Sequence, residues 1–438
     1  MLSLSKSLLG SVAVFALAAA ASSASAAVFC VNLPANPGCT AKTTISAAVA
    51  AAAAGDTVLI GAGTYHEQVT ITKPLSIGAT PGTKATIDAA GKSNGIFING
   101  LAATPNVGVA NVVVTGLEVE NANYEGIVAV NAANVSILNN HVHNNNKMLS
   151  NSTCPGIAAW ETSEAMDCGE GIHLVAVNHS TISRNLVENN AGGILISDET
   201  GSTFENTVSD NVVHDNGYAC GITMASHGAA NASGPIQALN YGIWHNIISS
   251  NQSYHNGTVI PGSGAGVGIF APGPGATNMA NIVIGNDLHD NGHPGVAMHN
   301  HASIPGAPPV VFNDNKIIGN HIYNNGSDTA DGATSGPTGI NIYSAGSISG
   351  TVVAQNTVDN ESIGIAFKAP ANSTLITHLN NFNANITGVE NLGSGTIDAT
   401  ENWWNCTYGP GSSSSCANPS GSNVTTLPYL LQPYNPNW

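Results

Sequence analysis

The hydrophobic positions of the chain follow one sequence motif, or phrase, that recurs from about residue 95 onward. It reads Gly, then Ile or Val, a second apolar residue two positions later, a polar turn, an apolar stretch, and the pattern Asn-x-apolar-x-x-Asn. Several successive glycines are 21 to 25 residues apart. Apolar alternation at such a period, without helical stretches, predicts a stacked β-solenoid. The glycines are Gly95, Gly126, Gly171, Gly193, Gly221, Gly242, Gly266, Gly295, Gly339 and Gly364.

Each repeat supplies short strands whose alternate residues point into a common core. A single coil cannot bury that face, so we expect the coils to stack and to pair in parallel. Glycine permits a tight corner, and Asn tolerates left-handed turns while its amide hydrogen-bonds along the stack. The recurring Asn therefore predicts a structural ladder. The phrases begin at Asn140, Asn185, Asn211, Asn286, Asn320 and Asn356.

The segment before the repeats predicts a short helix followed at once by strands. Thr44 is a suitable N-cap for an alanine-rich helix that reaches Ala54, and Gly55 would end it. Strand patterns follow over 57–60, 68–71 and 75–77.

Together these phrases resemble the right-handed parallel β-helix repeat of the pectin-lyase-like superfamily. The segment from Gly55 to Ile71 resembles the first coil after an N-terminal capping helix, and Trp403 and Trp404 resemble the closing segment of exported members. The resemblance implies an all-β, single-stranded right-handed parallel β-helix with both ends capped. The superfamily contains polysaccharide lyases, hydrolases, epimerases, esterases, adhesins and accessory proteins, so the fold does not fix the chemistry.

The first residues predict a secretory signal peptide. Lys6 precedes an apolar run over 8–21, and Ala24 and Ala26 form a small-residue cleavage site. This run is shorter than the ~20 residues of a membrane span. We therefore expect a secreted or periplasmic protein with a signal peptide over 1–26, an N-terminal cap over 27–55, a β-helix over 56–400 and a C-terminal cap over 401–438.

The cysteines suit an oxidising compartment, because six of the seven form three close pairs and leave Cys220 as a buried thiol. The expected disulfides are Cys30–Cys39, Cys154–Cys168 and Cys406–Cys416. The chain carries 9 Lys and Arg against 26 Asp and Glu, a net charge of −17. It therefore lacks the basic stripe that nucleic-acid binding requires, and we expect a monomer that binds a polysaccharide or oligosaccharide.

Strand alternation predicts which side chains face outward. With each recurring glycine as position 0, positions 1 and 3 point inward and positions 2, 4 and 6 point outward. Four histidines, a tyrosine and a lysine then share one outer strip with Glu199. In chain order the strip contains His173, Ser197, Glu199, Thr223, His227, Phe270, His299, His301, Asn341, Tyr343 and Lys368.

Long insertions flank this strip and predict the walls of a cleft. They cover 145–170, 226–240, 256–265, 271–279, 301–312 and 326–338. The first insertion carries Trp160, which would either stack on a sugar ring or plug its own loop. Its carboxylates are suitable calcium ligands; they are Glu161, Glu164, Asp167 and Glu170. We expect Trp160, His173 and Asn341 to bind substrate.

Three chemistries compete for the strip. β-Elimination or C5 epimerisation of a uronate requires a base near the C5 proton, which His299, His301, Tyr343 or Lys368 would supply. Hydrolysis requires two carboxylates, and Asp198–Glu199 is the only acidic pair on the strip. A transition-metal centre is the third, with Glu199 and His227 as ligands, joined in one variant by His299 and His301.

A second outer column lies three residues after each ladder Asn, and its length favours repeat-wide stacking over a local site. It contains His143, Glu188, His214, Tyr254, His289, Tyr323 and Asp359.

The sequence thus favours an exported carbohydrate-active enzyme of lyase or epimerase type. The alternatives are a glycoside hydrolase and a non-enzymatic binding, adhesive or metal-handling protein. Since the acidic chain would repel a polyuronate, either a cation such as calcium assists binding or the substrate is nearly neutral.

Overall fold

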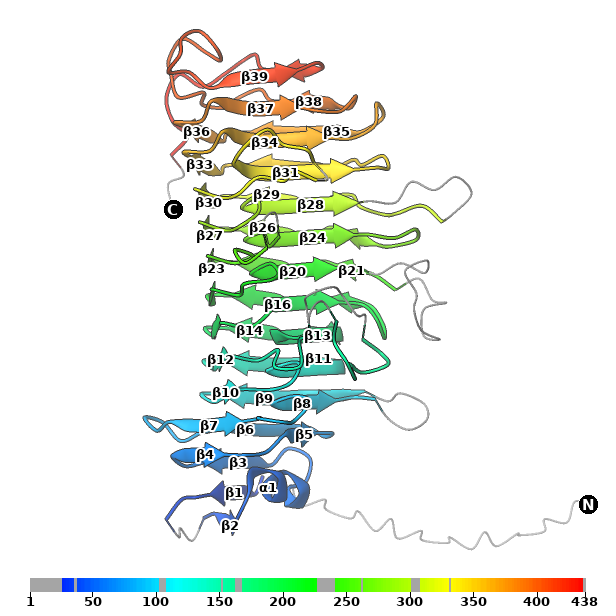
Figure 1. Cartoon of the computed structure of the whole chain (residues 1–438), viewed down its shortest axis with the longest axis vertical. Helices are drawn as coiled ribbons and strands as arrows, with labels where there is room; N and C mark the ends of the chain where they lie inside the picture. Colours follow the sequence, from blue (N-terminus) through cyan, green and yellow to red (C-terminus); the bar gives the residue numbers. More distant parts are fainter. Residues whose placement is uncertain are drawn as a thin grey trace, which may run out of the picture.

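The computed structural model describes residues 26–34, 38–101, 108–150, 153–161, 168–226, 241–260, 263–300, 308–330 and 332–435. These residues form a column of stacked coils that runs from the N-terminal end to the C-terminal end, and each coil contributes strands to three faces (Figure 1). All strand pairings between named strands are parallel, which confirms the predicted β-helix. Among the described residues, no helix is long and apolar enough to cross a membrane. The signal-peptide prediction rests on residues that lie largely outside the described ranges.

The first face carries the strands that begin at the recurring glycines. Ile194, Ile222, Val267 and Val296 occupy one inward column in strict register and are fully buried. The strands are β5 (Val69–Ile71), β8 (Ile96–Asn99), the first half of β11 (Ile127–Leu138), β13 (Glu170–Asn178), β16 (Gly192–Ser197), β20 (Ile222–Ala225), β24 (Val267–Ala271), β28 (Val296–Asn300), β31 (Thr338–Ser344), β34 (Ile363–Lys368), β37 (Thr387–Asn391) and β39 (Asn418–Gly421).

The second face continues from the first around a corner, and β11 runs through that corner without a break. It contains β1 (Val28–Val31), β3 (Thr57–Ile60), β6 (Leu75–Ala79), β9 (Val109–Thr115), the end of β11, β14 (Thr181–Ser183), β18 (Thr207–Ser209), β22 (Ile247–Ser249), β26 (Ile282–Ile284), β29 (Lys316–Ile318), β32 (Thr351–Ala354), β35 (Thr374–His378), β38 (Thr396–Asp398) and β40 (Val424–Thr425). β2 (Thr40–Lys42) pairs with β1, and β17 (Thr203–Phe204), β21 (Ile243–Trp244) and β25 (Asn278–Met279) form a short ladder at the corner.

The third face is an eleven-stranded parallel sheet of very short strands. Its strands are β4 (Gly63–Tyr65), β7 (Ala85–Asp88), β10 (Glu118–Glu120), β12 (His141–His143), β15 (Leu186–Glu188), β19 (Val212–His214), β23 (Gln252–Tyr254), β27 (Asp287–His289), β30 (His321–Tyr323), β33 (Thr357–Asp359) and β36 (Asn381–Asn383). The middle residue of each strand from β10 to β36 is buried, and its two neighbours point outward.

Asparagine ladders join the coils at the corners, as predicted. In one of them Nδ2 of Asn251 donates to Oδ1 of Asn286 at 2.9 Å and to the carbonyl of Val208 at 2.9 Å, while its own Oδ1 accepts from Asn211. The residue before each ladder Asn adopts a left-handed conformation, as at Ser250 with φ 56°. This ladder contains Asn140, Asn185, Asn211, Asn251, Asn286, Asn320, Asn356, Asn380 and Asn402.

The predicted second outer column stacks along the third face. The rings of His214, Tyr254, His289 and Tyr323 lie 4.7, 4.9 and 4.7 Å apart and are nearly parallel. Because each ring covers the faces of its neighbours, this stretch leaves little ring surface for a sugar, and the structural interpretation of this column is confirmed there.

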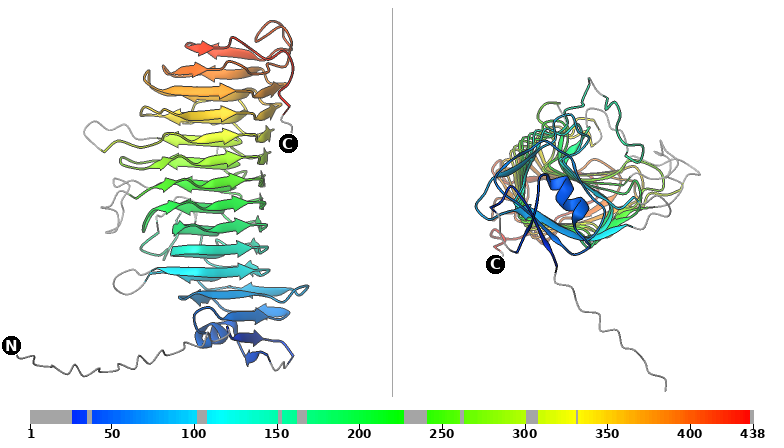
Figure 2. Two further views of the ribbon diagram at one scale, coloured as in Figure 1. Left: turned by 180° about the vertical axis from the view of Figure 1, so that it is seen from behind. Right: turned by 90° about the horizontal axis from the view of Figure 1, so that it is seen from below.

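The helix α1 (Ile45–Ala51) lies over the N-terminal end of the column, as the view from below shows (Figure 2). Thr44 is its N-cap, as predicted, but the helix ends at Ala51 instead of Ala54. The carboxylate of Asp56 accepts a hydrogen bond from the backbone of Ala53, and Gly55 occupies the turn that follows. Ala52, the C-cap residue, already has an extended backbone with ψ 142°, and the hydrogen bond to Asp56 holds the Ala53 amide outside the helix.

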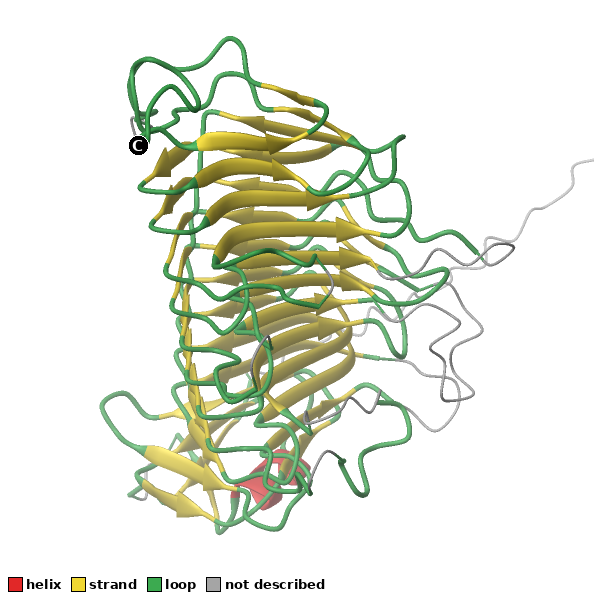
Figure 3. Cartoon of the chain, turned by 45° about the horizontal axis from the view of Figure 1, so that its top comes forward, coloured by secondary structure: helices red, strands yellow, loops and turns green. Residues whose placement is uncertain are grey.

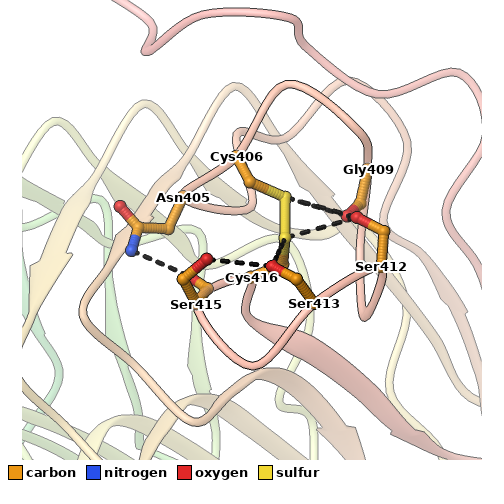
Figure 4. The surroundings of a disulfide bond; sticks show 7 residues. All are labelled: Asn405, Cys406, Gly409, Ser412, Ser413, Ser415 and Cys416. Atoms are coloured by element: carbon orange, nitrogen blue, oxygen red, sulfur yellow. Dashed lines mark hydrogen bonds between the residues drawn. A yellow bond between two sulfur atoms is a disulfide. The ribbon is translucent and has the colours of Figure 1, made fainter.

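At the opposite end Trp404 is fully buried and packs against Phe382, with ring centroids 5.2 Å apart, so the indole covers the core as expected. Figure 3 shows the loops that follow the last strands there. The Cys406–Cys416 disulfide closes one of these loops, and hydrogen bonds from Ser412 and Asn405 hold it (Figure 4). The other two predicted disulfides are also present, and Cys220 is a buried thiol.

Candidate active site

The outer surface of the first face brings His299, Tyr343 and Lys368 into one column on successive coils. Strand register aligns Phe270 with His299, His299 with Tyr343, and Tyr343 with Lys368. Neighbouring strands lie ~4.8 Å apart, so these side chains are adjacent. The alternation argument therefore predicted this juxtaposition correctly. His227 and His301 lie outside the described residues.

His299 contacts a buried carboxylate that the sequence did not single out. Its Nε2 lies 3.3 Å from Oδ2 of Asp328, and the two side chains are 2% and 0% exposed. Backbone amides of Ala330 and Gly332 donate to the Asp328 carboxylate at 3.1 and 2.6 Å and fix its position. Asp328 belongs to the insertion over 326–338, so the insertion was the available signal.

Asn341 completes this pair. Its Nδ2 lies 2.6 Å from Oδ2 of Asp328 and 3.2 Å from Nε2 of His299. Its Oδ1 is buried and has no hydrogen-bond partner among the described residues. Asn341, predicted as a substrate ligand, thus lies in the site, where its amide nitrogen orients the imidazole and the carboxylate.

The exposed part of this site consists of Tyr343 and Lys368. The Tyr343 ring lies edge-on to His299 with centroids 6.1 Å apart, and the Lys368 ammonium lies 5.3 Å from the centre of the Tyr343 ring. Both residues are partly exposed. An imidazole oriented by a carboxylate, a phenol and an ammonium are thereby gathered at one point, which is a set suited to proton transfer.

A second constellation surrounds His173, four coils closer to the N-terminus. Nδ1 of His173 lies 3.2 Å from Glu125, 3.8 Å from Glu161 and 3.8 Å from Glu170. Nε2 lies 2.7 Å from the Ser197 hydroxyl, which in turn bonds Glu199. We call Glu125, Glu161, Glu170, His173 and Glu199 the glutamate cluster.

The glutamate cluster is buried, and its ionisation reflects that. His173 and Glu125 are each 1% exposed, and Glu161 and Glu170 are 7% and 9% exposed. Burial and the charge of Glu125 raise the pKa of Glu161 well above its ordinary value. Glu161 therefore keeps its proton to a higher pH than an ordinary glutamate and lies beside other carboxylates, an arrangement that suits a general acid.

The glutamate cluster is also a candidate metal site. One ligand atom from each of Glu125, Glu170 and His173 lies within 4.8 Å of the others. A set of carboxylates with one imidazole nitrogen suits Mn²⁺, Fe²⁺ or Zn²⁺ better than it suits Ca²⁺, because Ca²⁺ prefers ligands that are all oxygen. Of the acids expected to bind calcium, Glu164 and Asp167 lie outside the described residues.

The structure does not bring together all the residues predicted for one metal centre. Glu199 follows β16 and His299 lies on β28, with β20 and β24 between them. Three inter-strand spacings amount to ~14 Å, which is too far for one coordination sphere. Glu199 lies beside His173 instead.

Trp160 covers an apolar patch on the outer surface of the first face. It stacks on Phe97 with centroids 6.4 Å apart and packs with Val128, Val130 and Val175. Valines on the outer surface are unusual for a solvated sheet, and the loop over 153–161 shields them from water. This packing favours the plug interpretation of Trp160 over the sugar-binding one.

Comparisons with known proteins agree on the fold. A family model described as a right-handed beta helix region matches residues 83–244. Pectate lyase Pel9A is similar at TM-score 0.50 with 12% identity, over 94% of this chain and 82% of that chain. PfbA, a surface adhesin of Streptococcus pneumoniae, is similar at TM-score 0.50 with 14% identity, over 87% of each chain. A comparison with curated proteins gave no match.

Proposed function

Because the chain is a right-handed parallel β-helix protein with a pectate lyase-like fold, we propose that it is an exported carbohydrate-active enzyme that abstracts a proton from a sugar unit of a polysaccharide. An enzyme and an adhesin share this fold, so the proposal rests on the side chains and not on the scaffold. The observation that carries it is the contact of His299 with the buried Asp328, in register with Tyr343 and Lys368.

The proposed chemistry begins at the carbon next to a uronate carboxylate. His299, oriented by Asp328, accepts the C5 proton. Lys368 is one of three basic residues from residue 149 onward, and its ammonium neutralises the carboxylate and so makes that proton more acidic. In elimination, the C5 electron pair forms the C4–C5 double bond, the C4–O bond breaks, and the leaving oxygen takes a proton from Tyr343. In epimerisation, Tyr343 returns a proton to the opposite face of C5 instead.

The negative charge of a polyuronate is consistent with a role for the Lys368 ammonium in binding it. A chain with a net charge of −17 repels a polyuronate over most of its surface. Lys368 therefore provides a rare attractive position, and lightly charged or partly esterified polymers are the substrates that we expect.

The test is incubation of the purified protein with a panel of polyuronates and neutral polysaccharides. We expect ultraviolet absorbance from an unsaturated uronate, or an inverted C5 centre in the product by NMR. His299→Gln and Tyr343→Phe should lower turnover at least 100-fold. Tyr323→Phe, which changes an outer tyrosine of the third face, should leave it unchanged. Binding without any turnover by the wild type would instead indicate a non-enzymatic role.

Glycoside hydrolysis at the glutamate cluster is a second candidate, favoured by the raised pKa of Glu161 beside Glu125. A hydrolase pairs a protonated carboxyl with an ionised carboxylate. It would release new reducing ends without the unsaturated chromophore, and Glu161→Gln would abolish that release while His299→Gln would not.

A further inference from the structure

The third face carries a cluster of histidine and glutamate side chains on its outer surface. In register, Glu118 lies beside His141, and Glu120 lies beside His143, which in turn lies beside Glu188. The residue between each outward pair is a fully buried valine. The side chains of this cluster therefore project together from a rigid sheet.

Two imidazoles face the same carboxylate oxygen. Nε2 of His143 lies 3.1 Å from Oε1 of Glu118, and Nδ1 of His141 lies 3.7 Å from that same atom. Oε2 of Glu120 lies 3.6 Å from Nε2 of His143. The ligand atoms of Glu118, His141 and His143 all lie within 4.8 Å of one another.

The remaining polar atoms of these side chains are held by other groups. Nε2 of His141 lies 2.8 Å from Glu188, and Nδ1 of His143 lies 2.7 Å from the Asn144 amide. Lys84 lies 2.9 Å from Oε2 of Glu118, which also accepts from the Thr86 hydroxyl. Each ring thus has one nitrogen that faces Glu118 and a second nitrogen that is held by Glu188 or Asn144. Outer partners of this kind orient the ligands of a metal ion.

This geometry differs from that of the histidines farther along the same column. His214 and His289 stack flat on their tyrosine neighbours, and Nδ1 of each bonds the next residue, Asp215 or Asp290, at 2.7 Å. The rings of His141 and His143 also stack on each other, with centroids 4.1 Å apart, but each of them directs a nitrogen at Glu118. Stacking alone does not require that convergence.

We propose that Glu118, His141 and His143, with Glu120 as a fourth ligand, bind a transition-metal ion of the Zn²⁺ class. Two imidazole nitrogens with a carboxylate form a recognised zinc donor set. Three glutamates surround the position against one lysine, so the local charge favours a cation. The site lies outside the candidate active site and does not depend on the proposed function.

The test uses the full chain, stripped of metal with a chelator and titrated with Zn²⁺ and, for spectroscopy, Co²⁺. We expect the His141→Gln/His143→Gln variant to bind one equivalent less than the wild type and to lose the visible bands of tetrahedral Co²⁺. His289→Gln is the matched control, because it removes a histidine from the same column and should retain both. Glu188→Gln should weaken Zn²⁺ binding 10- to 100-fold.

Retention of the full stoichiometry and Co²⁺ spectrum by the double variant would overturn the proposal, as would a wild type that binds neither ion. If the double variant fails to fold, Glu118→Gln gives the same comparison with both rings in place. Metal bound only at the glutamate cluster would be unaffected by any of these changes and would also overturn it.

Discussion

Glu361 occupies a ladder position that asparagine holds in the coils on either side. Its Oε1 accepts hydrogen bonds from the backbone and side chain of Asn325 at 2.8 and 3.1 Å, and its backbone donates to Asn385. Its Oε2 is buried and has no hydrogen-bond partner among the described residues. Burial raises the pKa of Glu361 from its ordinary value of 4.5 to about 7, against the lowering effect of the Asn325 hydrogen bonds.

The raised pKa of Glu361 makes the folded protein less stable as pH rises. Below pH 4.5 the carboxyl is protonated in both states, so its ionisation has no effect on the free energy of unfolding. Between pH 4.5 and about 7 only the unfolded chain loses the proton, so stability falls as pH rises. Above that range the loss is complete, and at 1.36 kcal/mol per pKa unit it amounts to about 3 kcal/mol. Glu361→Gln keeps the acceptor oxygen and removes the ionisation.

We therefore expect Glu361→Gln to match the wild type near pH 4 and to exceed its stability by about 3 kcal/mol near pH 8. Urea unfolding across this range measures the difference. Glu401→Gln, at an exposed position, is the control and should show no such pH dependence. A Glu361→Gln advantage that is constant with pH, or that shrinks as pH rises, would refute the reasoning.

Three further predictions concern the site and the corners. Asp328→Asn should lower kcat by about 10²–10⁴-fold in a turnover assay because it removes the charge that orients His299, and undiminished activity would separate Asp328 from the chemistry. Asn251→Ala should cost about 3–5 kcal/mol in urea unfolding because it strands the Asn211 amide and the Val208 carbonyl, whereas exposed Asn418→Ala should change stability by less than about 0.5 kcal/mol. Ser250→Gly should add about 0.5–1 kcal/mol, since Gly285 and Gly319 already occupy the same left-handed turn in later coils; a loss of stability would argue against strain at Ser250.

The fold followed from the sequence because the apolar residues repeat with the coil and strand alternation has a fixed period. That period also placed His299, Tyr343 and Lys368 in one column. It applies within strands and fails at the corners. Glu125 lies in the turn directly before Gly126, and Glu170 is the first residue of β13, directly before Gly171, so alternation counted from the glycines gave no direction for either.

Contacts from insertions were harder to predict. Asp328 reaches His299 from a loop whose path depends on tertiary packing and not on a local pattern. Backbone conformations imposed by the stacking of coils also could not be predicted. Arg184, Gln355 and Leu379 adopt left-handed conformations at φ 56°, 61° and 60°, although none of these residue types favours that region. The helix end at Ala51 was missed because the alanines that follow favour a helix, whereas the Ala53 amide bonds the Asp56 carboxylate instead of continuing it.

The asparagine ladder joins each coil to the next in the same way. The number of coils can therefore change while the two candidate sites remain. Asn251 and Asn286 are equivalent positions 35 residues apart, so excision of residues 252–286 removes one whole turn and lets Asn251 donate to Asn320. The shortened protein would keep the glutamate cluster and the group of His299, Asp328, Asn341, Tyr343 and Lys368, although His299 would lose its neighbour Phe270. The two sites would lie nearer to each other by one interstrand step of ~4.8 Å. If one polymer chain binds across both sites, the preferred length of the oligosaccharide would change in the shortened protein. If the ligand binds at only one site, the preferred length would not change.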